Sequence, residues 1–239
     1  MSLTGRTILI TGASSGIGAA IARRFAIAGA RLLLLGRDRE RLAVQARALS
    51  PLVAVQAYDV DLADAEPLAS RCERIARECP RLDALVHAAG LYDTGRFDDA
   101  SEHALTTLLQ VNVGAVFSVT RAFLPLLESA GGDIVVINST IVARPARGVA
   151  QYAASKHALK GLTDGLREEV SGRGIRVTTL FPGRTATPMQ ANVHAAEGKT
   201  YRPERLLQPE DVAGLALFAV TLPRTAELVE ATIRPALPP

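Results

Sequence analysis

The sequence has no tryptophan, only two cysteines and two methionines, and its aromatic residues amount to 4% of 239 residues. Two cysteines cannot build the disulfide framework of a small secreted domain. With so few aromatic rings, the chain also lacks the stacking residues of a surface that binds nucleic acid. The net charge of +3 comes from arginines scattered over the expected helices. We therefore expect no nucleic-acid partner.

Long hydrophobic runs and metal-binding patterns are missing as well. No apolar run approaches the ~18–20 residues that span a membrane, and the N-terminal segment has none of the three regions of a signal peptide. We expect a cytoplasmic protein with no membrane partner. Cys72 and Cys79 are expected to be packing residues, and the histidines form no ligand cluster, so no metal is expected. The histidines are His87, His103, His157 and His194.

Buried-strand patterns alternate with helical patterns along the whole chain, which is 48% hydrophobic. This alternation predicts an α/β fold: a doubly wound parallel sheet of about seven strands with helices on both faces, as one domain over residues 1–239. The strands are expected near residues 6–11, 31–36, 52–58, 82–87, 132–138, 175–181 and 227–233.

A glycine-rich loop, TGASSGIG, follows the first expected strand at residues 11–18 and precedes a helix expected over residues 19–28. Gly12 permits a tight turn, Gly16 lets the backbone approach a pyrophosphate, and Gly18 allows close packing of helix and strand. The N-terminus of the helix offers free N–H groups to the anion. The spacing differs from the usual GxGxxG fingerprint, so the strand and helix on either side carry the assignment.

A second group of residues has the spacing of proton-transfer chemistry. Ser139 follows an apolar strand pattern, and Tyr152 and Lys156 share one face of an expected helix at positions i and i+4. A cation near a phenol stabilises the phenolate and lowers its pKa from about 10, which would make Tyr152 an acid and base. The Ser139 hydroxyl, at the carboxyl end of a strand, can hydrogen-bond a carbonyl oxygen.

From about Leu3 to about Pro235, the chain resembles the short-chain dehydrogenases/reductases, which have the Rossmann fold. Five motifs carry the resemblance: the glycine loop, Asn112 in VNVG, Ser139, the YxxxK pair, and PGxxxTxM at residues 182–189. The resemblance implies strand order 3-2-1-4-5-6-7. It also implies hydride transfer between a nicotinamide cofactor and a small carbonyl or alcohol substrate, with a catalytic tetrad of Asn112, Ser139, Tyr152 and Lys156.

The family's residue roles transfer to the matching positions. The resemblance implies that Tyr152 protonates a carbonyl oxygen held by Ser139. It also implies that Lys156 lowers the phenol pKa and holds the nicotinamide ribose, and that Asn112 anchors a relay water. A homodimer or homotetramer is expected through the helices around residues 101–130 and 151–171. The expected cofactor-binding residues are Gly12, Ser14, Ser15, Gly16, Ile17, Gly18, Arg37, Asp59, Val60, Ala89, Gly90, Tyr152, Lys156, Pro182, Gly183, Thr185 and Thr187.

The choice of cofactor depends on the end of the second strand. Gly36 occupies the position where an acidic residue would bind the ribose 2′-OH of NAD, and Arg37 beside it suits a 2′-phosphate. We therefore expect NADP(H), with Ser14 as a second donor to the phosphate. The alternative is that Arg37 only opens a solvated helix over residues 38–49.

The family pattern is broken at two places. His87 and Ala88 replace the two asparagines of the motif NNAG, which predicts altered local hydrogen bonding, and Val142 replaces a small glycine near the substrate pocket. Residues 189–207, polar and without clear periodicity, are expected to form a short substrate lid. The expected substrate contacts are Leu91, Tyr92, Ile141 and Met189.

Two other functions stay open at this stage. The chain could be an NAD-dependent alcohol or hydroxy-acid dehydrogenase, or a regulator that binds a dinucleotide without turnover, since a fold alone does not determine function. The complete set of tetrad residues favours an enzyme.

Overall fold

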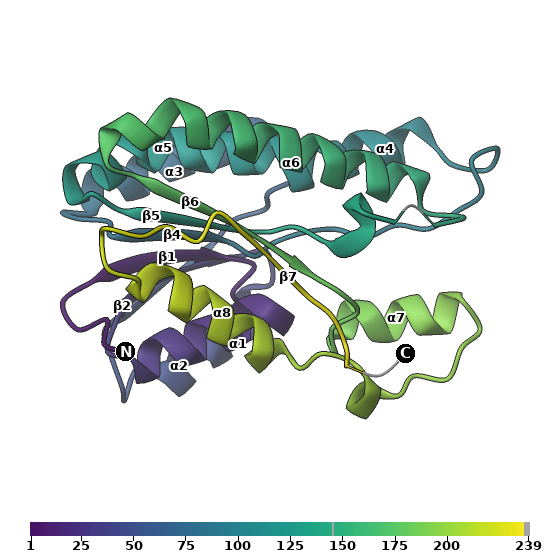
Figure 1. Cartoon of the computed structure of the whole chain (residues 1–239), viewed down its shortest axis with the longest axis horizontal. Helices are drawn as coiled ribbons and strands as arrows, with labels where there is room; N and C mark the ends of the chain where they lie inside the picture. Colours follow the sequence, from purple (N-terminus) through teal and green to yellow (C-terminus); the bar gives the residue numbers. More distant parts are fainter. Residues whose placement is uncertain (145, 237–239) are drawn as a thin grey trace.

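A computed structural model describes residues 1–144 and 146–236. Seven parallel strands form one sheet in the order β3-β2-β1-β4-β5-β6-β7, which confirms the expected topology (Figure 1). The strands are β1 (Thr7–Thr11), β2 (Arg31–Gly36), β3 (Val55–Asp59), β4 (Ala84–His87), β5 (Asp133–Ile137), β6 (Arg176–Pro182) and β7 (Glu230–Ile233).

Helices cover both faces of the sheet. Helices α1, α2 and α8 lie on one face, and α3, α5 and α6 lie on the other (Figure 1). The helices are α1 (Gly16–Ile27), α2 (Arg39–Leu49), α3 (Ala65–Glu78), α4 (Glu102–Leu109), α5 (Ala115–Ala130), α6 (Ala150–Val170), α7 (Pro188–Ala196) and α8 (Pro209–Thr221).

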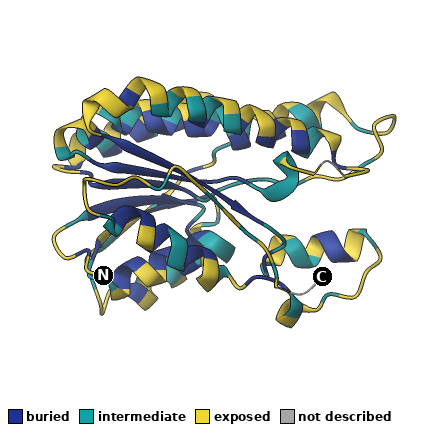
Figure 2. Cartoon of the chain, viewed as in Figure 1, coloured by how far each residue is buried: buried dark blue, intermediate teal, exposed yellow. Residues whose placement is uncertain are grey.

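The central strands are apolar because neither face meets water. Every residue of β1, β4, β5 and β6 is buried, and the helices expose only their outer sides (Figure 2). Parallel sheets covered on both faces have such continuous apolar strands. The order of strands reverses between β1 and β4, which pair directly. Ligands of open α/β sheets bind at the carboxyl ends of the strands beside this switch point.

Several expected boundaries were wrong by a few residues. Helix α1 begins at Gly16 instead of residue 19, so the last glycines of the loop form its first turn. Strand β3 begins only at Val55, because the N–H groups of Leu52 and Val53 turn back to the Leu49 carbonyl. Strand β7 begins at Glu230 instead of residue 227.

The segment expected to be an irregular lid, residues 189–207, contains a helix. Helix α7 begins after Thr187, whose hydroxyl accepts a hydrogen bond from the Gln190 N–H, and Pro188 occupies its first turn. A threonine cap followed by proline is a recognised start of a helix. A short 3₁₀ turn, Pro203–Arg205, precedes α8.

The sequence analysis expected no segment that could span a membrane. One helical stretch, Glu102–Ala130, is nevertheless long and apolar enough to do so. It comprises α4, a π-helical turn and α5. In the structure, α5 turns Val116, Val119 and Phe123 onto the sheet. The core therefore accounts for part of its hydrophobicity.

The replacement of an asparagine by His87 is compensated locally. His87 ends β4, is 2% exposed, and its Nε2 lies 2.9 Å from the hydroxyl of Thr120 on α5. Burial lowers the pKa of His87 to about 3, because a charged imidazole would lose its hydration. A neutral histidine thus links the sheet to helix α5.

Acid should destabilise the protein through His87. In the unfolded chain, His87 binds a proton below a pH of about 6.5. In the folded chain, the same side chain stays neutral until about pH 3. The free energy of unfolding therefore falls as the pH drops through this window. Lowering the pH from 7 to 5 should reduce the free energy of unfolding of the wild type by about 2 kcal/mol more than that of His87→Asn. Urea unfolding at both pH values measures this.

The exposed His103 on α4 provides the matched control, since His103→Asn removes a histidine that water already solvates. This control should keep the wild-type pH dependence. If His87→Asn and the wild type lose equal stability between pH 7 and pH 5, His87 is not held neutral by burial.

Candidate active site

The glycine loop packs directly against the chain that follows β4. Gly12 has φ +67°, and a Cβ there would lie 2.7 Å from the backbone of Ala89. A Cβ on Gly18 would collide with the carbonyl of Gly12. The N–H of Ala89 donates to the Thr11 hydroxyl at 3.3 Å. The loop therefore tolerates no side chain at Gly12 or Gly18.

The N-terminus of α1 suits an anion. Ser15 precedes the helix in an extended conformation and its side chain makes no capping hydrogen bond. No acidic residue lies in the first turn. The first N–H groups of a helix lack internal partners and attract phosphate when no side chain caps them. Ser14, Ser15, Gly16 and Ile17 thus form a cradle that fits the pyrophosphate of a dinucleotide.

The end of β2 fits the ribose 2′-phosphate expected beside it. Gly36 is buried, and a Cβ there would lie 3.3 Å from the Ser14 hydroxyl, so Ser14 and Gly36 are neighbours. Arg37 follows and is exposed. Asp38 caps α2 by accepting from the Arg41 N–H at 3.0 Å, so α2 does not need the Arg37 side chain.

The end of β3 and the residue that follows it lie beside Gly36, where the adenosine end of the cofactor is expected. Asp59 is opposite Gly36 in the register of β2 and β3, and the N–H of Val60 donates to the Gly36 carbonyl at 3.0 Å. The Asp59 carboxylate also pairs with Arg71 at 3.0 Å. The ion pair fixes Asp59 at the rim of this site.

Tyr152 and Lys156 lie one turn apart in α6, and the Lys156 Nζ is 5.8 Å from the centre of the Tyr152 ring. Lys156 is 4% exposed, and its amine donates to the Ile137 carbonyl at 3.3 Å. The carbonyl of Lys156 in turn accepts from the Asn138 side chain at 3.2 Å. The amine is therefore fixed between α6 and the end of β5.

The sequence predicted a lowered pKa for Tyr152, and this prediction was wrong for the chain without cofactor. Burial raises the pKa of Tyr152 to about 12, and the Ser139 hydroxyl opposes this only in part. Burial also lowers the pKa of Lys156 to about 8. Desolvation penalises both the phenolate and the ammonium, and it is the largest cause of both pKa shifts. Near neutral pH, Tyr152 keeps its proton.

Ser139 lies between β5 and a 3₁₀ turn, Thr140–Val142. Its hydroxyl oxygen accepts a hydrogen bond from the Ile141 N–H at 3.2 Å, which leaves the hydroxyl proton for another acceptor. The hydroxyl also interacts with Tyr152. Val142, half-buried, belongs to the same turn.

Asn112 has a structural role that the sequence reasoning missed. It sits in a π-helical turn, Gln110–Gly114, where its side chain accepts from the Leu91 N–H at 2.8 Å and donates to the Leu91 carbonyl at 3.0 Å. It also donates to the Ser155 hydroxyl at 2.9 Å, and Ser155 donates to the Tyr152 carbonyl. The buried asparagine thus connects the chain after β4 to α6.

Gly90 completes this connection. A Cβ at Gly90 would lie 3.3 Å from the Asn112 Oδ1 and 3.6 Å from the Lys156 Nζ. π-Helical turns concentrate at functional sites. The only sequence signal for this arrangement was a polar residue within the apolar pattern VNVG.

The PGxxxTxM segment closes the other side of the cradle. Pro182 ends β6, and the N–H of Gly183 donates to the Ile233 carbonyl. The Thr185 hydroxyl donates to the Gly183 carbonyl at 3.0 Å. A Cβ at Gly16 would lie 3.1 Å from the methyl of Thr187, so this segment contacts the glycine loop.

The expected substrate residues are only partly brought together. The Tyr92 ring lies 4.7 Å from that of Tyr152, edge to face, and Leu91 and Ile141 are linked to Asn112 and Ser139 through their backbones. Met189 on α7 is 42% exposed, and the described contacts do not join it to Tyr152.

An ion-pair group near Tyr92 was not expected from the sequence. Arg184 donates two hydrogen bonds to Glu197, at 2.8 and 3.0 Å, and Lys199 pairs with the same carboxylate. The pKa of Tyr92 is raised by burial and then by Glu197, while Arg184 opposes the shift. These charges join the start and end of α7 at the edge of the site.

A family model described as short chain dehydrogenase matches residues 6–198. The chain belongs to the short-chain dehydrogenase family. The chain is 37% identical to sulfoacetaldehyde reductase 2 of Chromohalobacter salexigens over 226 residues, which cover 90% of this chain and 88% of that protein.

Solved structures of other family members agree with the fold. A putative NAD(P)-dependent gluconate 5-dehydrogenase from Beutenbergia cavernae, with bound NADP, has a TM-score of 0.88 and 35% identity, covering 97% of this chain and 96% of that one. A short chain dehydrogenase from Burkholderia cenocepacia in complex with NADP has a TM-score of 0.86 and 34% identity, covering 98% of both chains.

Removing the Asn112 side chain should loosen the site. Asn112→Ala leaves the Leu91 backbone and the Ser155 hydroxyl without a buried partner, which should lower the free energy of unfolding by about 1–3 kcal/mol. Urea unfolding measures the loss. The control is Asn192→Ala at an exposed position of α7. A loss below roughly 0.5 kcal/mol, typical of surface substitutions, would show that these hydrogen bonds do not hold the site together.

Proposed function

We propose that this short-chain dehydrogenase is an NADP(H)-dependent oxidoreductase that interconverts a small carbonyl compound and its alcohol. One observation carries the proposal. The Tyr152 phenol contacts the Ser139 hydroxyl and lies one helical turn from the buried amine of Lys156, while the chain that follows β4 links this group to the glycine cradle. Proton transfer and dinucleotide binding thus share one edge of the sheet.

The proposed roles follow from the contacts. The Ser139 hydroxyl oxygen accepts from Ile141 and the hydroxyl contacts Tyr152, and its proton turns to a substrate carbonyl oxygen when one binds. Tyr152, protonated near neutral pH, gives its proton to that oxygen in the reducing direction. The cofactor, when bound, supplies the hydride. Lys156 promotes the return of a proton to Tyr152. Asn112 holds Leu91 and α6 in fixed positions relative to each other through its hydrogen bonds.

The buried amine of Lys156 is suited to a proton relay. With a pKa near 8, it gains and loses a proton close to physiological pH. We assign to Asn112, from the family resemblance, the water that connects Lys156 to solvent. Lys156 also holds the nicotinamide ribose in this proposal.

The preference for NADP(H) rests on Gly36 and Arg37. No carboxylate stands at Gly36 to repel a 2′-phosphate, Ser14 adjoins it, and the exposed Arg37 offers a planar charged donor set. The family members with bound NADP support the same choice. An NAD-dependent dehydrogenase and a non-catalytic regulator remain the alternatives that the experiments below test.

We also propose that the chain is one cytoplasmic domain that forms a homodimer or homotetramer through the helical stretch α4–α5 and through α6. The surface of α5 supports an interface, because Phe117 is 51% exposed there and Arg121 lies over its ring. The proposed substrate contacts are Leu91, Tyr92, Ile141 and Met189, with α7 as the lid.

Replacing Arg37 should weaken the use of NADPH, which carries the 2′-phosphate, and not that of NADH. Arg37→Gln removes a charged donor from the 2′-phosphate, so kcat/KM for NADPH should fall roughly tenfold or more, which corresponds to about 1.5–3 kcal/mol, while the value for NADH stays within twofold. Gly36→Asp should shift the preference toward NADH by repulsion. Kinetics with both cofactors measure this, using carbonyl substrates that include sulfoacetaldehyde. A wild-type preference for NADH would contradict the assignment.

Replacing Tyr152 should separate chemistry from binding. Tyr152→Phe lacks the proton donor, so turnover should fall by about 10²–10⁴-fold or more, while NADPH affinity stays within about twofold. Absorbance at 340 nm and calorimetric titration measure the two effects. Tyr58→Phe on β3 is the matched control. Binding of NADPH without turnover by the wild type over a broad panel of carbonyls would favour the regulator.

A further inference from the structure

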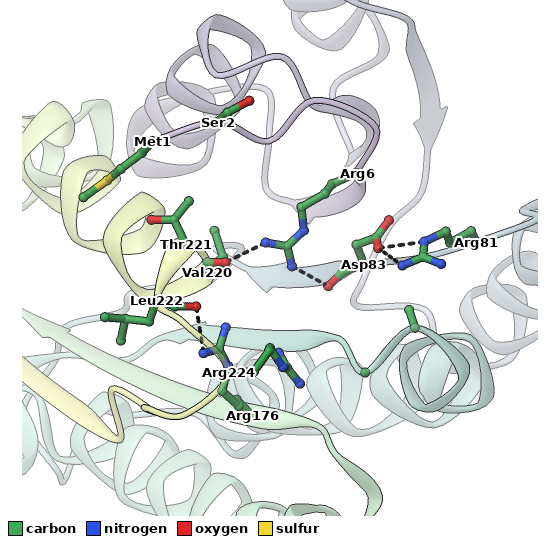
Figure 3. Close-up of a pocket in the computed structure, with 12 residues that line it drawn as sticks. Met1, Ser2, Arg6, Arg81, Asp83, Arg176, Val220, Thr221, Leu222 and Arg224 are labelled. Atoms are coloured by element: carbon green, nitrogen blue, oxygen red, sulfur yellow. Dashed lines mark hydrogen bonds and ion pairs between the residues drawn. The ribbon is translucent and has the colours of Figure 1, made fainter.

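A cavity lies at the opposite end of the sheet from the proposed active site. It has a volume of about 530 Å³ and lies where β1, β4 and β6 begin, beside the carboxyl end of α8. Four arginines and one aspartate contribute its charged lining (Figure 3). They are Arg6, Arg81, Arg176, Arg224 and Asp83.

The charges around this cavity do not balance. Asp133, which begins β5, is 3% exposed and pairs with three of the arginines: with Arg6 and Arg176 at 2.7 Å and with Arg224 at 3.2 Å. Asp83 pairs with the fourth, Arg81, at 2.7 Å. Four guanidinium groups therefore face two carboxylates, which leaves the cavity with an excess of two positive charges.

Two of the four arginines, Arg6 and Arg176, stabilise the fold. Arg6 donates to the Val220 carbonyl at 2.6 Å, and Arg176 donates to the carbonyls of Leu222, Pro223 and Ala226. These bonds satisfy the end of α8 and the segment that leads toward β7. Figure 3 shows Arg6 extending between the end of α8 and Asp83. Arg6 and Arg176 therefore serve the fold.

Arg81 and Arg224 contribute more charge than the fold requires. Their side chains are 56% and 48% exposed, and Asp133 keeps Arg6 and Arg176 if Arg224 is removed. The described hydrogen bonds occupy Nε and one Nη of Arg81, and both Nη atoms of Arg224. A guanidinium has five N–H groups, so three of each arginine remain for a ligand at the cavity.

We propose that this cavity binds a small molecule that carries phosphate groups. Arginine forks match the geometry of phosphate oxygens, and the excess charge favours a dianionic or more highly charged group over a monoanion. A volume of about 530 Å³ lies within the usual range for small-molecule sites. Arg81 and Arg224 bind the phosphate, while Arg6 and Arg176 maintain the positive potential behind it.

The site is separate from the cofactor cradle. The cradle uses the carboxyl ends of β1 and β2, whereas the cavity uses residues at the amino ends, such as Arg6 before β1 and Arg176 at the start of β6. A ligand could therefore occupy the cavity while a dinucleotide occupies the cradle.

Calorimetric titration of the full chain with inorganic pyrophosphate tests the proposal. The titration is done with saturating NADP⁺, so that phosphate binding at the glycine loop does not contribute. We expect one pyrophosphate per chain, bound at least tenfold more weakly by Arg81→Gln/Arg224→Gln. Both side chains are about half exposed, so this variant should unfold at nearly the wild-type temperature and keep its affinity for NADP⁺.

The matched control is Arg23→Gln/Arg47→Gln, which removes the same charge from exposed positions of α1 and α2. It should bind pyrophosphate like the wild type. The proposal is overturned if the wild type binds no pyrophosphate, if the cavity variant binds it unchanged, or if the control weakens binding as much as the cavity variant.

Discussion

The burial of Lys156, with the partial burial of Tyr152 beside it, is the constraint on which the proposed chemistry depends. Lys156 is buried, and its described hydrogen bond leads to a neutral carbonyl, that of Ile137. Desolvation without a carboxylate partner makes the amine a weaker base and the phenol a weaker acid. Near neutral pH the phenol therefore keeps the proton that a reduction must deliver, and the amine, with a pKa of about 8, is mostly protonated.

The surrounding structure keeps Lys156 buried and Tyr152 partly buried. Asn112 and Gly90 join the chain after β4 to α6, and Gly12 brings the dinucleotide loop against the same chain. Each contact involves backbone at the carboxyl end of a buried parallel strand. Because the strands are covered on both faces, these ends have little freedom to move. The site gains its rigidity from the sheet.

Much of this could be predicted from the sequence, since apolar strands and glycine loops carry strong local signals. Strand order, the cradle and the spacing of Tyr152 and Lys156 were all accessible. The pKa direction of Tyr152 was not, because a pattern gives proximity to a charge but not the extent of burial. The Thr187–Pro188 signal could have revealed α7. The partner that compensates for His87, Thr120, lies 33 residues away and is found only in three dimensions. Likewise, arginines that look scattered in the sequence converge at Asp133.

The most direct test of this account is the pKa of Tyr152 in the chain without cofactor. Carbon-13 NMR of protein labelled at the tyrosine Cζ follows each phenol with pH, and the spectrum of Tyr152→Phe identifies the signal. The account predicts a pKa of about 12. A pKa at or below the ordinary value of about 10 would show that charge, not burial, governs this site.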